Sequence, residues 1–484
     1  MSALLGVGFL VLTVRHLVAD HYGAYVALIA LIDVFYLSTG LGLSTIAQRY
    51  VAEFRLRATP RRLHAFIGGL FVRRICHSLL FGALLLGLHE YVLPALGLPI
   101  QERLLPLVVI LLMAAASLAM LDEVLAALLL QGSAQAMAMT RNLIKVGVVG
   151  AILLAGRNLN IDVLLVTELV AVVLAMALGY ILLYRQLRRD VDAEGGDSHY
   201  EVRGMWGMAG RFYLIQLIGQ AYGQNVAKLI ITRMLGLAQT AAYGFAQSIA
   251  DMLANYLPAH LLAGWLRPLM VSRYLARGKI SDLVDVANLV LKLNLIGILP
   301  VAVFFGLYGD RFASWVTGGK YGHAGLLLML VTLFIGLQTV HLMVAMIAMT
   351  VEQASSNLVA TLMSGASLPL SLLLIHWLGT EGASLGLICS ELVWIASAVY
   401  LLYRRGFPIE WDIGGSLRLC VAGVGAAIVG YLLPIVDGAP LLQLSLAAVV
   451  IGGVFLLLAV LTKPLREAER TLIRGIIPAR FVIL

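Results

Sequence analysis

The sequence predicts an all-α, polytopic membrane protein of about 14 transmembrane helices, and three observations support this fold class. Of the 484 residues, 61% are apolar and only 12% are charged. Mean hydropathy is +0.95, and a soluble domain of this composition would lack the polar residues needed to cover its surface. Apolar segments also recur along the whole chain, with short polar stretches between them.

The length of these apolar segments defines the predicted spans. A bilayer core about 30 Å thick requires about 20 apolar residues per helix. By this rule the chain holds fourteen spans, at residues 1–18, 24–47, 75–97, 104–130, 139–155, 162–184, 207–235, 239–266, 286–308, 324–348, 357–378, 383–403, 414–434 and 441–461. We therefore predict a six-helix lobe at 1–184, a linker at 185–206, a second six-helix lobe at 207–403, and two further helices with a tail at 404–484.

The basic residues predict the orientation. Counted over alternate connections between spans, one side holds 24 Lys and Arg residues and the other side six. The richer side includes the polar stretches 48–74, 131–141, 185–206 and 267–285 and the tail after residue 462. Because basic residues concentrate on the cytoplasmic side, we expect both termini to be cytoplasmic. The same distribution explains the net charge without nucleic acid as a partner.

The sequence contains an internal repeat. Arg15, Tyr25 and Asp33 recur as Arg233, Tyr243 and Asp251, at a constant offset of 218. Gln135-Ala136 recurs at the same offset, and "GRNLNIDVLLVTELV" (156–170) matches "GTEGASLGLICSELV" (379–393) at an offset of 223. Six crossings return the chain to its starting side, so the repeat predicts two copies in the same orientation, related by an axis along the membrane normal.

The repeat also bears on the first predicted span, which has only about 14 apolar residues before Arg15, too few to cross a bilayer. Its counterpart starts near Gly207, a position that maps upstream of Met1. We expect either that the native chain begins earlier or that this helix is tucked against its neighbours. A secretory signal peptide is disfavoured, because the apolar stretch follows no basic segment.

Several motifs resemble the polysaccharide flippases of the multidrug/oligosaccharidyl-lipid/polysaccharide exporter superfamily, which includes the O-antigen flippases. They are "YGAY" and "STGLGLSTIAQRYVAEFR" in the first half, and "AAYGFAQSIADML", "VTGGKYGHAGLLLML" and "GTEGASLGLICSELV" in the second. The resemblance implies a fourteen-helix transporter whose two lobes surround a cavity that opens alternately to each side. It also implies a polyprenyl-diphosphate-linked oligosaccharide as substrate, with membrane lipids and other polysaccharide-assembly membrane proteins as partners.

Polar and basic residues within the spans are candidates for substrate binding, because polar groups in a membrane usually face a watery interior. Four polar residues recur every four positions in the seventh span: Gln216, Gln220, Gln224 and Lys228. This spacing predicts one polar face on a helix. Four basic residues could hold a diphosphate: Lys145, Arg211, Lys228 and Lys292. The alternative is that these long side chains extend to the interface instead.

Acidic residues within the spans are candidates for ion coupling. Asp33 and Asp251 occupy matching positions of the repeat, where an unpaired carboxylate could take up a proton or a sodium ion. The alternative is a buried hydrogen bond that fixes helix packing. Glu168 and Glu391 are a second matched pair, and Asp122-Glu123 are expected to pair with Lys145 or Arg141. Gln247, Asp251 and Asn255 extend a polar face on the eighth span, before a kink expected at Pro258.

The sequence gives little support for an enzyme. "GASLG" (382–386) matches the G-x-S-x-G pattern but lies at the end of a predicted membrane helix, where a nucleophile elbow cannot form. The histidines show no metal-ligand spacing, Walker A is absent, and Cys76, Cys389 and Cys420 lie far apart in apolar segments. We therefore expect no catalytic residues, metal or cofactor. A membrane glycan polymerase or ligase is disfavoured by the short outer loops, and a multidrug or cation exporter of the same superfamily is the main alternative.

Overall fold

The computed structural model describes residues 2–98, 102–191, 197–198, 200–202, 204–433 and 440–474. Apart from one isolated bridge between Ala58 and Asp197, the regular structure of these residues is helical. The chain forms two compact units, Met1–Ala241 and Ala242–Leu484. The predicted domain boundaries at 184/185, 206/207 and 403/404 stay a prediction.

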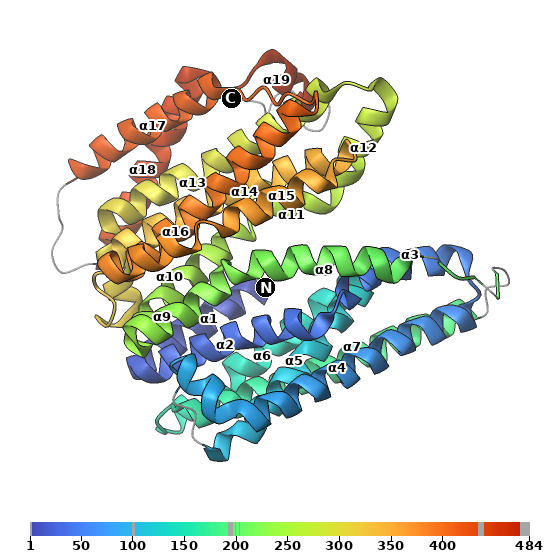
Figure 1. The fold of residues 1–484 in the computed structure, drawn as a ribbon. Helices are drawn as coiled ribbons and strands as arrows, with labels where there is room; N and C mark the ends of the chain where they lie inside the picture. The colour runs from blue at the N-terminus through green and yellow to red at the C-terminus, as the bar shows by residue number, and fades with distance from the viewer. Residues whose placement is uncertain are drawn as a thin grey trace. The chain divides into compact units, whose positions relative to one another are not determined.

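The first unit is built from ten α-helices and one short 3-10 helix among the described residues (Figure 1). They are α1 (Ser2–His16), α2 (Ala19–Gly40), α3 (Leu43–Arg57), α4 (Pro60–Ala95), η1 (Glu102–Leu104), α5 (Leu105–Ala127), α6 (Gln131–Leu154), α7 (Ile161–Val191), α8 (Met205–Ala221), α9 (Gln224–Leu235) and the start of α10 (Leu237–Ala254).

The helices after α10 belong to the second unit. They are α11 (Pro258–Leu261), α12 (Ala263–Arg277), α13 (Ile280–Thr317), α14 (Gly325–Thr350), α15 (Ala354–Gly365), α16 (Leu368–Arg404), α17 (Ile413–Tyr431), α18 (Pro440–Thr462) and α19 (Glu467–Arg474). Helix α10 ends at Ala254 and α11 begins at Pro258, which confirms the interruption expected at that proline.

All fourteen predicted spans fall on helices, so the predicted fold class is confirmed. Ten helices of the described chain are long and apolar enough to cross a membrane. The other spans correspond to shorter or interrupted helices: α1, the pair α8 and α9, the pair α10 and α11, and α15 with the first part of α16. The short first helix is present from Ser2 and packs against α6.

Helix α16 contains two of the predicted spans. At Gly379 the backbone turns out of helical geometry, with φ 64° and ψ −134°, a conformation that favours glycine. The chain then folds back so closely that a Cβ at Gly382 would lie 2.0 Å from the carbonyl oxygen of Leu374. The glycines of "GTEGASLG" therefore serve helix packing, and the resemblance of this segment to a nucleophile elbow is accidental.

Several stretches predicted as polar connections are helical. Helices α3 and α4 cover most of 48–74, α6 begins at Gln131, and α12 covers most of 267–277. The length rule counts only the part of a helix that fits the hydrocarbon core, whereas helices continue beyond it into the aqueous phase. As a result, Arg74 and Arg141, which the sequence places at the ends of connections, lie well inside helices.

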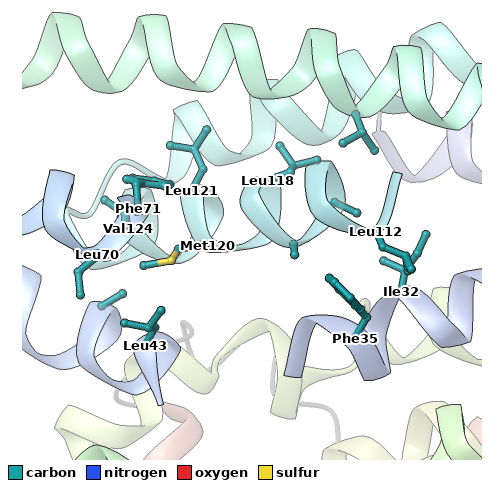
Figure 2. Close-up of a cluster of buried hydrophobic side chains, with 14 of the residues drawn as sticks. Ile32, Phe35, Leu43, Leu70, Phe71, Leu112, Leu118, Met120, Leu121 and Val124 are labelled. Atoms are coloured by element: carbon teal, nitrogen blue, oxygen red, sulfur yellow. The ribbon is translucent and has the colours of Figure 1, made fainter. Parts of the chain in front are cut away.

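Each unit has its own apolar core. In the first unit α5 is central, and Figure 2 shows its side chains Leu112, Leu118 and Leu121 among residues of α2, α3 and α4. In the second unit α13 is the central helix, since it packs against α14 and against the hairpin of α17 and α18. The cysteines Cys76, Cys389 and Cys420 are unbridged.

Candidate functional site

A cluster of charged residues lies inside the first unit, on helices α2, α6, α7 and α9. We call Asp33, Arg141, Lys145, Glu168 and Lys228 the first-unit charge cluster. At its centre the Glu168 carboxylate is 1% exposed. It accepts hydrogen bonds from Arg141 Nε at 3.1 Å, from Arg141 Nη2, and from Tyr25 OH at 3.0 Å, and it pairs with Lys145 Nζ at 2.5 Å. Two cations therefore converge on one buried carboxylate.

Arg141 and Lys145 reach Glu168 together because they are four residues apart on α6, and such residues lie on one helix face. Lys145 is buried, and its ammonium also lies 5.1 Å from the centre of the Phe9 ring. The Arg141 side chain is 34% exposed. Glu168 carries one negative charge against the two positive charges of Arg141 and Lys145, so one positive charge is left over. The partly exposed Arg141 side chain makes this charge accessible.

That guanidinium borders a cavity of about 270 Å³ between α2, α5 and α6. The walls are mainly apolar, and their charged residues are Asp33, Asp122 and Arg141. The remaining lining residues are Ile29, Ile32, Tyr36, Ala115, Leu118, Ala119, Ala134, Met137 and Ala138. The cavity can hold a small charged group, since it presents both signs of charge within an apolar shell.

Asp33 is solvent-accessible although it lies in the middle of α2. The side chain of Asn225 is within hydrogen-bonding reach of its carboxylate, and Lys228 and Arg141 are the positive charges that act on it. Lys228 in turn donates to Asn225 Oδ1 at 3.4 Å. The structure thus brings the predicted coupling residue Asp33 near the predicted substrate ligand Lys228, whereas Lys145 joins the cluster through Glu168.

The polar face predicted for the seventh span is interrupted. Helix α8 ends at Ala221, and α9 starts at Gln224 after Gly223, whose extended backbone breaks the helix. Gln216 and Gln220 therefore lie on α8, whereas Gln224 and Lys228 lie on α9, and the four do not share one continuous face. Arg211 is exposed on α8. Only α9 packs extensively against α2, which explains why Lys228 alone joins the charge cluster.

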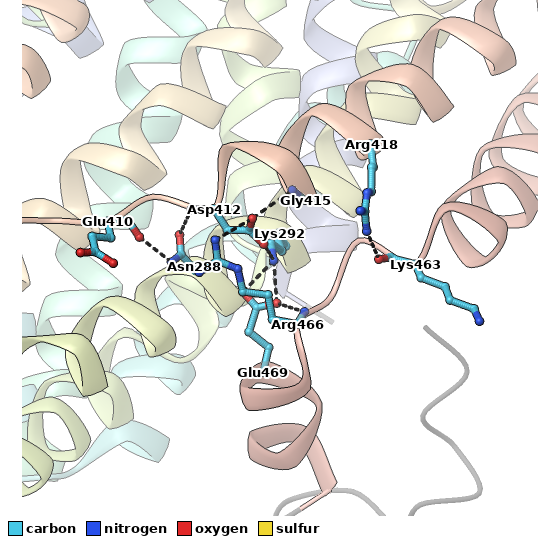
Figure 3. A network of polar contacts seen from close by, with 9 residues as sticks. All are labelled: Asn288, Lys292, Glu410, Asp412, Gly415, Arg418, Lys463, Arg466 and Glu469. Carbon is cyan, nitrogen blue, oxygen red and sulfur yellow. Dashed lines mark hydrogen bonds and ion pairs between the residues drawn. The ribbon is translucent and has the colours of Figure 1, made fainter.

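Lys292 needs a correction, because it does not face a cavity. Its ammonium is buried and bonds to Asp412 and to both oxygens of Glu469, at 2.7 and 2.6 Å for the latter (Figure 3). Arg466 adds a bond to Asp412 Oδ1 at 2.9 Å. We call these four residues the C-terminal charge network. The Lys292 ammonium donates its hydrogen bonds to two carboxylates. We therefore assign Lys292 a structural role, in which it links α13 to α19 and to the start of α17.

Asp412 lies before α17, outside the predicted spans, and also accepts the backbone N–H of Gly415 at 3.2 Å. Burial alone would raise the pKa of Asp412. The hydrogen bonds from Lys292 and Gly415, together with the charges of Lys292 and Arg466, instead lower this pKa below its usual value.

The expected pairing of Asp122-Glu123 with Lys145 or Arg141 is wrong, because both cations bind Glu168. Glu123 instead accepts a hydrogen bond from Tyr36 OH at 2.5 Å and one from Gln48 at 3.4 Å. Arg74, which is fully buried, donates to the Tyr36 carbonyl at 2.9 Å and lies over the Tyr36 ring. Asp122 borders the cavity.

The second unit holds the repeat counterparts Asp251 and Glu391. Asp251 is exposed on α10. Glu391 pairs with His341 Nδ1 at 2.7 Å, and the His341 ring stacks on Trp394 with centroids 3.5 Å apart. The partner of this carboxylate is therefore an imidazole, whereas Glu168 has a guanidinium and an ammonium.

The sequence interpretation missed Arg141 and Tyr25 as site residues. The length rule places Arg141 in a connection, and Tyr25 stands out in the sequence only as part of the repeat. The spacing of Arg141 and Lys145 was the available signal, since two cations on one face of an apolar helix predict a shared anionic partner.

The fold and its apolar helices define a class of protein, the multi-pass helical membrane proteins. No protein-family model matches the sequence, and no curated protein matches it. Among solved structures, the chain is similar to lipid II flippase MurJ in an inward closed conformation, with a TM-score of 0.67 and 10% identity over 94% of this chain and 96% of MurJ.

It is also similar to an inward-facing multidrug resistance MATE transporter of the MOP superfamily, with a TM-score of 0.58 and 15% identity over 83% of this chain and 94% of that one. The Vibrio cholerae MATE transporter VcmN gives a TM-score of 0.56 and 16% identity over the same shares. The chain therefore shares its fold with a lipid II flippase and with multidrug transporters.

Proposed function

We propose that this protein flips a polyprenyl-diphosphate-linked oligosaccharide from the cytoplasmic to the outer leaflet of a cell inner membrane, by alternating access, for the biosynthesis of surface polysaccharide. The observation that carries the proposal is the accessible cation Arg141 at an internal cavity, with Lys228 nearby. A diphosphate is the part of such a substrate that is hardest to move through a membrane, and guanidinium and ammonium groups are its natural partners.

The extent of the structural likeness supports the same function. MurJ matches 94% of the chain, whereas the MATE transporters match 83%. MurJ is described as a lipid II flippase, and its fold accounts for more of this chain than the folds of the multidrug transporters do. Membrane lipids and other polysaccharide-assembly membrane proteins are the proposed partners.

Asp33 is the proposed coupling residue of the first unit. Its carboxylate competes with an anionic substrate for Arg141 and Lys228, so uptake of a proton or a sodium ion at Asp33 leaves these cations to the diphosphate. Asp251 is proposed for the same role in the second unit, because it occupies the position of the repeat that matches Asp33.

A second candidate is a multidrug or cation exporter. It is favoured by the cavity itself, whose walls are mainly apolar and carry two carboxylates, Asp33 and Asp122. Organic cations bind in sites of this kind through apolar contact and acidic groups.

One experiment separates the two functions. The purified protein is placed in proteoliposomes under imposed proton and sodium gradients, and the flux of a fluorescent polyprenyl-diphosphate oligosaccharide is compared with the flux of an organic cation. Gradient-dependent movement of the lipid-linked sugar, with no transport of the cation, is the expected result. Transport of the cation alone would replace the flippase by the exporter.

The proposed orientation has its own test. Reporter fusions in the 185–206 segment and after Leu461 should both give cytoplasmic signals, because basic residues concentrate on that side. An outward signal from either fusion would reverse the topology.

A further inference from the structure

A second basic site lies in the first unit, away from the charge cluster. It is a groove of about 350 Å³ between α3, the first turns of α4 and the segment before α8. Its charged lining residues are Arg62, Arg73 and Glu201. We call it the α4 groove. Its floor is aromatic, since Phe54 and Phe66 stack with ring centroids 4.0 Å apart.

Both arginines of the α4 groove are positioned by contacts that leave hydrogen-bond donors available. The Arg73 guanidinium lies 5.2 Å from the centre of the Trp206 ring. A Cβ at Gly69 would lie 3.2 Å from Arg73 Nη1, so the glycine keeps room for this group. Arg62 contacts the Tyr200 carbonyl at 3.5 Å and Glu201 at 2.9 Å. Glu201 is 77% exposed, and such surface pairs are weak and exchange easily.

The α4 groove lies where α4 passes from an apolar to a polar environment. Around and beyond Arg73, the side chains Val72, Ile75 and Leu79 are 61%, 44% and 54% exposed, and their spacing places them on one helix face. A contiguous exposed apolar face on a membrane helix is covered by lipid chains. Trp206, which is 45% exposed, has the amphipathic ring typical of the headgroup level.

The neighbouring helix α7 carries a similar arginine–aromatic pair beside the start of α4. His64 of α4 contacts the carbonyl of Leu187 in α7 at 3.0 Å, so these two turns lie side by side. The next residue, Arg188, lies 4.6 Å from the ring of Tyr184, which is 54% exposed.

We propose that the α4 groove binds the phosphate of a monoanionic glycerophospholipid, such as phosphatidylglycerol, whose acyl chains lie along the exposed face of α4. Among the described lining residues, two guanidinium groups stand against one carboxylate, and this excess of positive charge suits a single phosphodiester. A choline headgroup fits poorly, because its trimethylammonium would face the arginines. The lipid joins α4 to the segment before α8 and thereby stabilises the start of that helix.

The test uses the purified full-length chain in detergent, with melting temperature measured against added lipid. Phosphatidylglycerol should raise the melting temperature more than phosphatidylcholine at the same mole fraction. In R62A/R73A the apparent affinity for phosphatidylglycerol should fall about tenfold to a hundredfold, the usual effect of losing charge-assisted hydrogen bonds. The matched control is R49A/R61A, which removes the same charge from the same region outside the groove and should bind like the wild type.

Other outcomes overturn the proposal. Equal stabilisation by the two lipids, or full phosphatidylglycerol binding by R62A/R73A, removes the site. An equal shift with soluble glycerol phosphate shows that free phosphate suffices and no lipid is selected. If R62A/R73A does not purify as a single species, photoreactive phosphatidylglycerol is cross-linked to the wild type instead. Cross-links should map to residues 62–73 and 201–206, and their absence there contradicts the assignment.

Discussion

Glu168 in the first unit and Glu391 in the second occupy matching positions of the repeat but have different partners. Glu168 is enclosed by Arg141, Lys145 and Tyr25, whereas Glu391 contacts His341 at the edge of a Trp394 stack. The offset of 218 aligns Arg141 with Val359, so the cation is specific to the first copy. One copy therefore surrounds its carboxylate with a guanidinium, an ammonium and a phenol, whereas the other copy has an imidazole as its partner.

The guanidinium of Arg141 suits the binding of an anionic substrate, because the charge of an arginine does not depend on pH. Glu391 instead contacts the imidazole of His341. Four predictions test this difference between the two carboxylates, in order of decreasing effect.

E168Q should lower the free energy of unfolding by about 3–5 kcal/mol, because it leaves two buried or half-buried cations without their carboxylate. E391Q should cost about 1 kcal/mol, because it weakens one hydrogen-bonded contact between two partly exposed side chains. Denaturant unfolding of the purified proteins measures both. Adding K145M to E168Q should recover part of the loss. Equal costs for the two Gln variants would show that the two carboxylates are equivalent.

R141A should reduce the flux of lipid-linked oligosaccharide about tenfold or more while the protein still reaches the membrane, because Glu168 keeps Lys145 and Tyr25 as partners. R141K should recover flux only partly, since an ammonium cannot reproduce the two-pronged contact. V359A, at the aligned position of the second unit, is the control and should transport normally. Normal flux in R141A would remove the guanidinium from the site.

D33N should flatten the proton or sodium dependence of flux in proteoliposomes, and D251N should do so less, because Asp33 adjoins Arg141 and Lys228. If these carboxylates only fix helix packing, the Asn variants keep a hydrogen bond, lose ~1 kcal/mol of stability and retain their gradient dependence. Unchanged gradient dependence in D33N/D251N would therefore assign both residues to structure.

The smallest effect concerns pH and the C-terminal charge network. Because the pKa of Asp412 is lowered in the folded protein, its contribution is complete above the ordinary aspartate pKa, about 3.9, and is lost as the pH falls through the lowered value. The difference in melting temperature between wild type and D412N should therefore stay constant from about pH 5 to pH 8 and shrink only in stronger acid. A difference that changes across neutral pH would show that another group titrates with the network.

The sequence predicted the membrane spans well, because hydropathy over about 20 residues reports directly on the helix interiors. It could not show that the regular spacing of Gln216 to Lys228 crosses a break at Gly223, since a single glycine is often tolerated within a helix. The partners of Glu168 and Lys292 also could not be predicted from the sequence. These contacts join residues far apart in the chain, and only helix packing selects one partner among several charges.

The tether of Lys292 also sets an order of events during synthesis. Its partners Asp412 and Glu469 follow it by 120 and 177 residues. At ordinary translation rates of about 5–20 residues per second, Lys292 waits roughly 9 to 35 seconds for Glu469 to be made. Throughout that interval α13 carries a cation without the carboxylates that it binds in the folded protein. The contacts of the C-terminal charge network can therefore form only after α19 has been made.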